Sequence, residues 1–236
     1  GVDFEQKKDK TFASIADNEA ERAIREIILK KFPHHAFVGE EEGMVGNGKT
    51  IWHVDPLDGT SNFKNKIAYC CVSIGVEQEG KFIFGLIYNP FSDELFHAEE
   101  GKGAYLNGKK IGVNTQPLTE GVMVIDASFS GKSAAIKVGL QHELLHLTSR
   151  FRMTGSNAMQ LAELAKGTYT SSLSDVINSY DFAAGVVIAT EAGAIVTDQH
   201  GNKPTANSKV LIASNAQSTH DLLLPLVRKY YSQITL

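Results

Sequence analysis

The stretch Trp52-His53-Val54-Asp55-Pro56-Leu57-Asp58-Gly59-Thr60-Ser61-Asn62-Phe63 places two aspartates, a turn-forming Pro and Gly, and a hydroxyl cluster directly after an apolar run. A carboxylate at the end of a buried strand is costly unless a positive charge pairs with it. Asp55 and Asp58 lie three residues apart and together indicate a divalent cation. The Gly-Thr-Ser that follows offers backbone N–H groups at an expected helix start, which suits a phosphate. The working hypothesis is a metal beside a phosphate.

Each part of this pattern also has a purely structural explanation. Asp58 can simply cap the segment that follows it. A second acidic run, Glu40-Glu41-Glu42, follows a short apolar segment, and for Glu42 we expect an ordinary solvated charge. Asp181 starts an expected helix, where a carboxylate is favoured by about 0.3 to 1 kcal/mol. Because the acidic positions occur together, the metal hypothesis is favoured over the separate explanations.

Hydrophobic periodicity predicts helices and strands along the chain. An amphipathic helix is expected over 17–31, with Asn18 and Glu21 as a capping box at its start. The runs 69–77 and 81–89 predict a hairpin across Glu79-Gly80. Strands and helices alternate in the second half, which predicts an α/β layered lobe. Further strands are expected over 36–38, 51–54, 95–98, 122–127, 196–197 and 210–213, and further helices over 133–146, 157–165, 181–192 and 220–231.

Polar turn chemistry between about 114 and 121, around Pro117, marks the expected domain boundary. We expect an N-terminal α+β lobe over 1–117, which carries Glu40 and the two-aspartate motif. A C-terminal α/β lobe over 118–236 would carry Asp181 and the residues on the substrate side.

The composition is that of an ordinary soluble globular protein. Of the 236 residues, 42% are hydrophobic and 21% are charged. The net charge of -4, without a basic cluster, gives no reason to expect nucleic-acid binding. No apolar run is long enough to span a membrane, and the polar start is unlike a signal peptide. Cys70 and Cys71 are adjacent and are expected to be buried small hydrophobes, which fits a reducing cytoplasm.

The sequence as a whole resembles a known family. The inositol monophosphatase family has motifs similar, in the same order, to Gly39-Glu40-Glu41, the run 52–63, Tyr180-Asp181-Phe182-Ala183-Ala184-Gly185 and Glu191-Ala192-Gly193. It belongs to the magnesium-dependent, lithium-sensitive phosphatases, which also include fructose-1,6-bisphosphatases. The resemblance runs from about Lys7 to the C-terminus. It implies an α/β fold, a layered αβαβα sandwich of the inositol monophosphatase and fructose-1,6-bisphosphatase type.

The resemblance implies which oxygens would hold magnesium. Glu40 and Asp55, with the backbone carbonyl of Leu57, would hold one Mg²⁺. Asp55, Asp58 and Asp181 would hold a second, so that Asp55 bridges the pair, and the family implies two or three ions in all. Oxygen-only ligation of this kind suits magnesium, a hard cation that shares substrate phosphate oxygens.

The same resemblance implies the groups that activate water and hold the phosphate. Thr60, hydrogen-bonded to Asp17, would help Glu40 to orient and deprotonate a metal-bound water. Glu41 would contribute nearby. The backbone amides of Gly59 and Thr60 would hold the phosphate. In-line attack by water on a clamped phosphate needs no covalent phosphoenzyme.

The alcohol side of the substrate is where the sequence departs from the family pattern. Members that prefer inositol phosphates carry a Glu seven residues before the metal Asp, and that position is Ser174 here, with Asp175 beside it. The usual Gly-Thr-Ala is Gly155-Ser156-Asn157, where Asn157 is either a hydrogen-bonding substrate contact or an ordinary helix-start residue. The residues expected to line the substrate site are Asp58, Gly155, Ser156, Asn157, Ser174 and Asp181.

These observations favour a Mg²⁺-dependent phosphatase that acts on a small phosphate monoester, by default inositol 1-phosphate. Histidinol phosphate, fructose 1,6-bisphosphate and a nucleotide phosphate are the alternatives within the class. A different alternative is a non-catalytic scaffold for protein or RNA partners, although the intact set of carboxylates argues against it. Family members are commonly dimers, so we expect a homodimer. The family normally has another helix before the position of Lys7, so either that helix is trimmed or this is a short member.

Two other motifs compete with this interpretation. Residues 142–146 read His-Glu-Leu-Leu-His, which fits the H-E-x-x-H motif of zinc peptidases. The longer zinc-peptidase motif fails, because Ser149 and Arg152 stand where its Gly and third His belong. We expect a helix with two surface histidines. Residues 128–133 are similar to a phosphate loop, but Asp126 occupies the position of its first Gly.

Overall fold

The chain folds into alternating layers of helix and sheet. The computed structural model describes residues 4–6, 12–125, 133–148, 150–175 and 177–231. The helices are α1 (Ile15–Lys31), α2 (Thr60–Lys64), α3 (Ser133–Leu144), α4 (Asn157–Ala165), α5 (Ser179–Glu191) and α6 (Gln217–Tyr231). The strands are β1 (Phe4–Gln6), β2 (Phe12–Ser14), β3 (Ala36–Gly39), β4 (Gly43–Val45), β5 (Thr50–Asp58), β6 (Cys71–Gln78), β7 (Lys81–Asn89), β8 (Glu94–Glu99), β9 (Gly103–Leu106), β10 (Lys109–Lys110), β11 (Met123–Ile125), β12 (Phe151–Arg152), β13 (Ser171–Asp175), β14 (Ile195–Asp198) and β15 (Val210–Ser214).

Two large sheets divide the molecule. The first has eight strands in the order β10-β9-β8-β7-β6-β5-β3-β4, antiparallel except for the β3–β5 pair. The second has five strands in the order β12-β11-β13-β15-β14, in which β11 pairs parallel with both β12 and β13. β1 and β2 form a small separate hairpin. The first sheet ends at Lys110 and the second begins at Met123, while the division at 117/118 stays a prediction.

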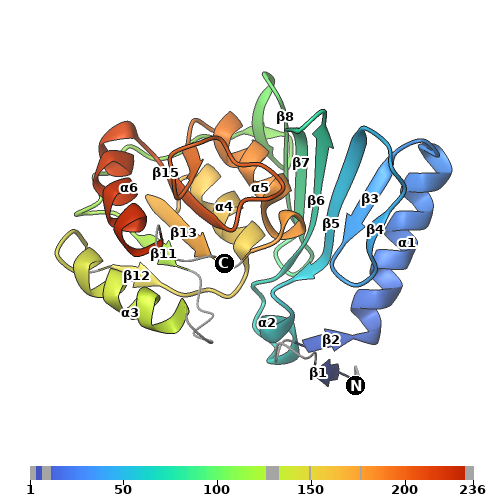
Figure 1. Cartoon of the computed structure of the whole chain (residues 1–236), viewed down its shortest axis with the longest axis horizontal. Helices are drawn as coiled ribbons and strands as arrows, with labels where there is room; N and C mark the ends of the chain where they lie inside the picture. The colour runs from blue at the N-terminus through green and yellow to red at the C-terminus, as the bar shows by residue number, and fades with distance from the viewer. Residues whose placement is uncertain (1–3, 7–11, 126–132, 149, 176, 232–236) are drawn as a thin grey trace.

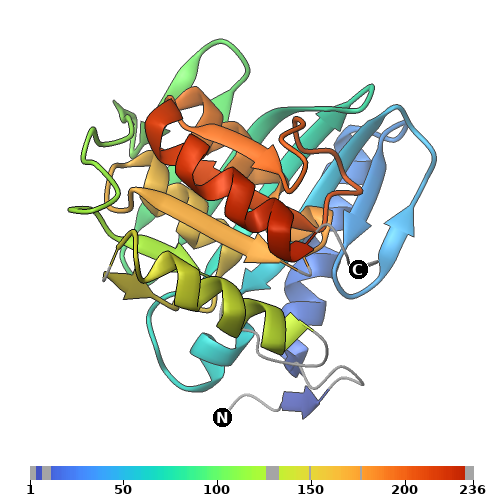
Figure 2. The same cartoon turned by 60° about the vertical axis from the view of Figure 1, so that its left-hand side comes forward.

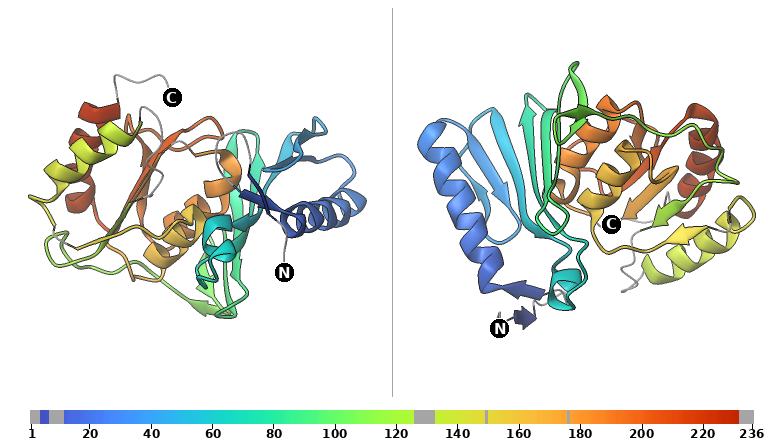
Figure 3. Two further views of the ribbon diagram at one scale, coloured as in Figure 1. Left: turned by 90° about the horizontal axis from the view of Figure 1, so that it is seen from below. Right: turned by 180° about the vertical axis from the view of Figure 1, so that it is seen from behind.

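Helices form the outer layers and the layer between the sheets. α1 covers the outer face of the eight-stranded sheet, while α4 and α5 fill the space between the two sheets (Figure 1). α3 and α6 run side by side across the outer face of the five-stranded sheet (Figure 2). The views from below and from behind show the same five layers (Figure 3). The layered αβαβα sandwich expected from the sequence is confirmed.

Small residues let α5 lie unusually close to the eight-stranded sheet. A Cβ atom added to Gly75 on β6 would lie 2.5 Å from the Cβ of Ala183. A Cβ added to Gly85 on β7 would lie 2.2 Å from the carbonyl oxygen of Ala184. Buried apolar side chains of α4, α5 and the sheet complete this contact. The close approach fixes the N-terminus of α5, and with it Asp181, against the end of β5.

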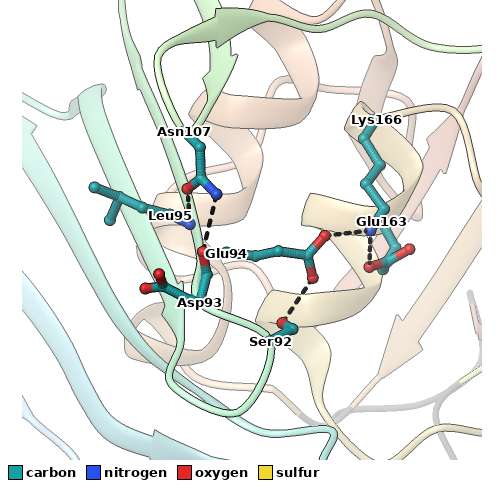
Figure 4. Close-up of polar contacts among 7 residues, drawn as sticks. All are labelled: Ser92, Asp93, Glu94, Leu95, Asn107, Glu163 and Lys166. Atoms are coloured by element: carbon teal, nitrogen blue, oxygen red, sulfur yellow. Dashed lines mark hydrogen bonds and ion pairs between the residues drawn. The ribbon is translucent and has the colours of Figure 1, made fainter.

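An ion-pair network connects the C-terminal end of α4 to strand β8 of the first sheet. The ammonium of Lys166 lies 2.7 Å from a carboxylate oxygen of Glu94 on β8 and 2.7 Å from one of Glu163 on α4 (Figure 4). Ser92 donates a hydrogen bond of 2.8 Å to the other oxygen of Glu94. These groups are half-buried, so the pairs are screened less than surface pairs and hold the middle layer against β8.

Most of the expected elements are present with small shifts at their ends. The helix over 157–165 is confirmed as α4, and the hairpin across Glu79-Gly80 joins β6 and β7, with both turn residues at positive φ. The predicted capping box is wrong: α1 begins at Ile15, so Asn18 lies inside the helix, and the Glu21 side chain bonds elsewhere. The expected strand over 122–127 runs into residues outside the described ranges.

A buried histidine predicts a pH-dependent stability. His220 on α6 is 2% exposed, and its ring hydrogen-bonds Ser214 and Thr197 at 3.1 Å each. Burial lowers the pKa of His220, while Asp221 raises it weakly. As the pH falls below about 6.5, the unfolded chain takes up the proton first, so stability is lost until the pH reaches the lower pKa of the folded state.

We expect His220 to add a slope approaching about 1.4 kcal/mol per pH unit to the free energy of unfolding below pH 6.5. Urea unfolding between pH 5 and 7 measures it. The difference between the wild type and His220→Gln isolates this residue from His53, whose pKa burial also lowers. His200→Gln, at an exposed position, is the control and should leave the slope unchanged. Equal slopes in the wild type and His220→Gln would contradict the prediction.

Candidate metal and phosphate site

An irregularity in β5 brings its two aspartates to one face of the sheet. Side chains alternate along a strand, so residues three apart normally point to opposite faces. In β5, Asp55 pairs with Ser73 of β6 and Asp58 pairs with Cys71, so three steps on one strand match two on the other. The extra residue is a β-bulge at Pro56-Leu57, a position where a strand tolerates proline. Both carboxylates are buried, with 2% and 6% of their surface exposed.

Four carboxylates from three parts of the chain repel one another electrostatically. Glu40 follows β3, Asp55 and Asp58 belong to β5, and Asp181 lies in the first turn of α5. Burial raises the pKa of Asp55 well above its ordinary range, and the charges of Glu40, Asp58 and Asp181 raise it further. Burial also raises the pKa of Asp58 to about 6, and Glu40 contributes. The fold therefore gathers four carboxylates, of which Asp55 and Asp58 are shielded from solvent.

Asp58 also connects β5 to the start of α4. Its Oδ2 atom accepts hydrogen bonds of 2.6 Å from the Ser156 hydroxyl and 2.6 Å from the backbone N–H of Ala158. Its Oδ1 atom accepts a longer bond of 3.3 Å from the N–H of Asn157. These donors form the N-terminus of α4, whose dipole favours a carboxylate. The bonds lower the pKa of Asp58 and oppose the effect of its burial. Asp58 does not cap the segment after it, because α2 follows Gly59 without a side-chain cap. Its oxygens instead accept from the first turn of α4, whose own N-cap is Ser156.

The donor set fits a hard divalent cation. The charged side chains that shift the pKa of Asp55 are all carboxylates, so oxygen is the available ligand atom. Within the described ranges, no three His, Cys, Asp or Glu side chains already surround one point at metal-ligand spacing. A cation bound among the four acids would relieve their mutual repulsion.

The turn after Asp58 has the backbone expected of a tight loop. α2 begins at Thr60, as the sequence predicts, and Gly59 precedes it with φ 94°. A Cβ added to Gly59 would lie 3.0 Å from the Tyr69 carbonyl oxygen. The Thr60 hydroxyl donates a hydrogen bond of 3.2 Å to the Leu57 carbonyl. A hydroxyl has a single proton to donate, so this proton is not used in the bond to Asp17 that the resemblance implies. Asp17 is buried in the first turn of α1, and its role stays a prediction.

Two adjacent residues expected near the alcohol part of the substrate, Ser174 and Asp175, have different surroundings in the structure. Ser174 and Asp175 are adjacent on β13 and point to opposite faces of the sheet. Asp175 faces α3 and α6, where the Lys137 ammonium lies 2.5 Å away and the Tyr231 hydroxyl donates at 2.6 Å. It therefore cannot replace the missing Glu. Ser174 is 4% exposed, and the role of Asn157 beside Asp58 stays a prediction.

Sequence reasoning missed a side chain beside the site that connects two distant parts of the chain. The amide nitrogen of Asn62 donates to the Tyr69 carbonyl at 2.7 Å and to the Thr154 carbonyl at 2.6 Å. Thr154 directly precedes Gly155, one of the residues expected on the substrate side. The available signal was the position of Asn62 inside the 52–63 motif, where an amide can satisfy two carbonyls at once.

A buried hydrogen-bonded chain was also missed. The two ring nitrogens of His53 on β5 bond the Ser179 hydroxyl at 2.8 Å and a Glu77 carboxylate oxygen at 2.9 Å. Ser179 begins α5, two residues before Asp181, and His53 lies two residues before Asp55. The chain thus ties together the two elements that carry these aspartates.

The competing motifs gain no support from the structure. Glu143 of the H-E-x-x-H run accepts from Lys229 at 2.7 Å and from Tyr230 at 3.3 Å, and these contacts hold its pKa below the ordinary value. A general base of a zinc peptidase would need to face the metal instead. His142 and His146 are both exposed, as expected. Most of the run 128–133 that is similar to a phosphate loop lies outside the described residues, which omit 126–132.

Comparisons with known proteins find similarity along nearly the whole chain. The family model described as "Inositol monophosphatase family" matches residues 2–232. A fructose-1,6-bisphosphatase/inositol-1-monophosphatase of Aquifex aeolicus is 34% identical over 230 residues, which cover 96% of this chain and 86% of the relative. The Nus factor SuhB of Escherichia coli is 32% identical over 226 residues, or 94% of this chain and 85% of SuhB. The crystal structure of the suhB protein of Bartonella henselae superposes with a TM-score of 0.90 at 32% identity, covering 97% of this chain and 89% of that one.

Proposed function

Because this chain belongs to the inositol monophosphatase family, we propose that it is a Mg²⁺-dependent phosphatase that hydrolyses a small phosphate monoester. The observation that carries the proposal is a group of four carboxylates, in which Asp55 and Asp58 are buried and the other three each add to the repulsion at Asp55. A non-catalytic protein has no evident need for this arrangement, because buried charges of one sign destabilise a fold unless a cation binds between them.

Magnesium would be held by Glu40, Asp55, the Leu57 carbonyl, Asp58 and Asp181. The number of ions, two or three, stays a prediction. When bound, Mg²⁺ supplies a water of lowered pKa and neutralises charge on the leaving oxygen. The hydrogen bonds from Ser156 and Ala158 support this assignment, since they hold Asp58 at a fixed place between β5 and α4.

The chain itself would position the phosphate and the water. The left-handed conformation of Gly59 turns the backbone away from β5, and the amides of Gly59 and Thr60 would donate to phosphate oxygens. Glu40 would accept the proton of the attacking water. Thr60, whose hydroxyl donates to the Leu57 carbonyl, would help Glu40 to orient that water. Phosphoryl transfer depends mostly on such positioning and on charge stabilisation.

The alcohol part of the substrate would contact Gly155, Ser156, Asn157 and Ser174. Ser174 offers a neutral hydroxyl where inositol-specific members have a carboxylate. Inositol 1-phosphate remains the default substrate, and fructose 1,6-bisphosphate is the second candidate, because the name of the Aquifex relative includes both activities. A scaffold for protein or RNA is the alternative of another class, favoured by the Nus factor name of the E. coli relative.

The test is phosphate release from a panel of monoesters, with Mg²⁺ and with EDTA. The panel holds inositol 1-phosphate, fructose 1,6-bisphosphate, histidinol phosphate, NADP and adenosine 3′,5′-bisphosphate. We expect release that requires Mg²⁺ and is absent in Asp55→Asn. If the folded protein binds Mg²⁺ and yet releases no phosphate from any member, the scaffold proposal replaces this one.

Two further expectations concern assembly and location. No helix in the described part of the chain combines the length and apolar character needed to cross a bilayer. The cytoplasmic location and the homodimer stay predictions, and light scattering on the purified protein measures the second.

A further inference from the structure

A buried glutamate on α1 holds the turn that carries Glu40. Glu21 is fully buried, with 0% of its surface exposed. One of its carboxylate oxygens accepts a hydrogen bond of 2.9 Å from the backbone N–H of Glu41, and the other accepts one of 2.8 Å from Glu42. Hydrogen bonds from N–H groups to a charged oxygen are about twice as strong as neutral ones. The two bonds therefore fix the backbone immediately after Glu40.

The residue before Glu40 is shaped to admit this carboxylate. A Cβ atom added to Gly39 would lie 2.4 to 2.5 Å from the carboxyl carbon and both oxygens of Glu21. No real contact is that short, so any larger residue at 39 would displace the Glu21 side chain. Gly39 and Glu21 thus form one seat, and Glu40 extends from it.

A second contact from α1 holds the far end of the turn. Arg25, one helical turn after Glu21, forms an ion pair with Glu42. The solvated charge expected for Glu42 is therefore paired instead, although the side chain stays partly exposed. The turn needs such support because three adjacent carboxylates repel one another and favour an extended, solvated backbone.

We propose that Glu21 is a positioning residue for the metal site, which sets the place of Glu40 through the backbone of the turn. The inference rests on the proposed function, since it assigns Glu40 to the metal. Gly39 pairs with Val54 of β5, so Glu40 follows at the position beside Asp55. Because Glu40 lies on the turn after β3, its position depends on how that turn is held. Glu21 is not among the residues assigned to the metal or the substrate, so its effect would pass through the two backbone bonds.

The test is Mg²⁺ binding measured by calorimetry, which does not depend on turnover. We expect Glu21→Ala to weaken Mg²⁺ binding by at least ~10-fold, the usual effect of removing a group that orients a ligand. Glu21→Gln keeps one acceptor oxygen and should lose less. Glu19→Ala removes the same charge from the exposed face of α1 and should bind Mg²⁺ like the wild type.

A double-variant cycle tests the seat itself. Gly39→Ala should weaken Mg²⁺ binding as Glu21→Ala does, because the added methyl group displaces the carboxylate. In the Glu21→Ala background that methyl group has room, so Gly39→Ala should add less than a factor of about two. Additive losses in the double variant would show that the two residues act separately, and would overturn the seat.

Melting temperatures in EDTA separate positioning from stability. A purely structural role would lower the melting temperature of Glu21→Ala and leave the Mg²⁺ dissociation constant of the folded protein unchanged, which would refute the inference. If Glu21→Ala does not fold, Glu21→Gln decides by the same comparison. The proposed function fails on a different result, the absence of Mg²⁺-dependent phosphate release by the wild type, and the binding experiment remains informative in that case.

Discussion

Replacing Asp55 by Asn is expected to abolish phosphate release at saturating Mg²⁺. Asn is isosteric and can still accept the 2.9 Å hydrogen bond from the N–H of Leu57, so the bulge of β5 should persist. It lacks the negative charge that would bridge two cations. The interaction lost is worth several kcal/mol, and about 1.4 kcal/mol corresponds to a factor of ten, so we expect a loss of at least ~10³-fold in kcat.

The same variant should lose activity without losing stability in the absence of metal. Asp55 is 2% exposed and repelled by three other carboxylates, so neutralising it removes an unfavourable interaction from the metal-free protein. In EDTA, Asp55→Asn should melt at a temperature no lower than that of the wild type, and the stabilisation by added Mg²⁺ should shrink. Asp221→Asn, on the exposed face of α6, serves as the control. Near wild-type turnover in Asp55→Asn would refute the assignment of this residue to the metal.

Replacing Lys137 by Met is expected to cost more stability than any surface substitution. Lys137 and Asp175 form an ion pair of 2.5 Å in which the two side chains are 2% and 1% exposed. Removal of the ammonium leaves Asp175 as a buried charge, with the Tyr231 hydroxyl as a neutral hydrogen-bond donor. Breaking such a pair typically costs ~3 to 5 kcal/mol of unfolding free energy.

Urea unfolding at pH 7 measures this loss. Adding Asp175→Asn to Lys137→Met should restore most of the stability, because Asn carries no charge and still accepts from Tyr231. Lys229→Met is the matched control, since Lys229 pairs with Glu143 at 2.7 Å with its side chain 60% exposed, and it should change little. If the double variant is no more stable than Lys137→Met, the cost does not come from the unpaired charge.

The buried pair also explains why the sequence could not settle the substrate side. Ser174 and Asp175 are neighbours in the chain, and either could stand near the position of the family's Glu. Only the pairing of β13 with β11 and β15 decides that Asp175 faces α3 and α6. A one-residue change of register reverses every side chain of a strand, and local sequence contains little information about register.

The carboxylate cluster shows a similar division. Apolar runs and turn residues are local signals, so the sequence predicted the helices, the main strands and the acidic positions within a few residues. It also predicted which residue types could hold a cation. The capping box at Asn18 and Glu21 was wrong because the same residues fit a local cap and a distant contact equally well. In the structure, the Glu21 carboxylate makes the distant contact and accepts hydrogen bonds from the backbone N–H groups of residues 41 and 42.

By itself, the sequence determined the order of elements, the layered α/β class and the chemistry of the acidic residues, because these depend on side-chain type and spacing along the chain. The tertiary structure alone decided which groups meet. The bulge at Pro56-Leu57 turns Asp55 and Asp58 to one face, and the helix α4 comes from a hundred residues away to bond Asp58. The seat of Glu21 against Gly39 likewise joins distant segments. Such contacts depend on sheet register and on the packing of layers, which are properties of the whole folded chain.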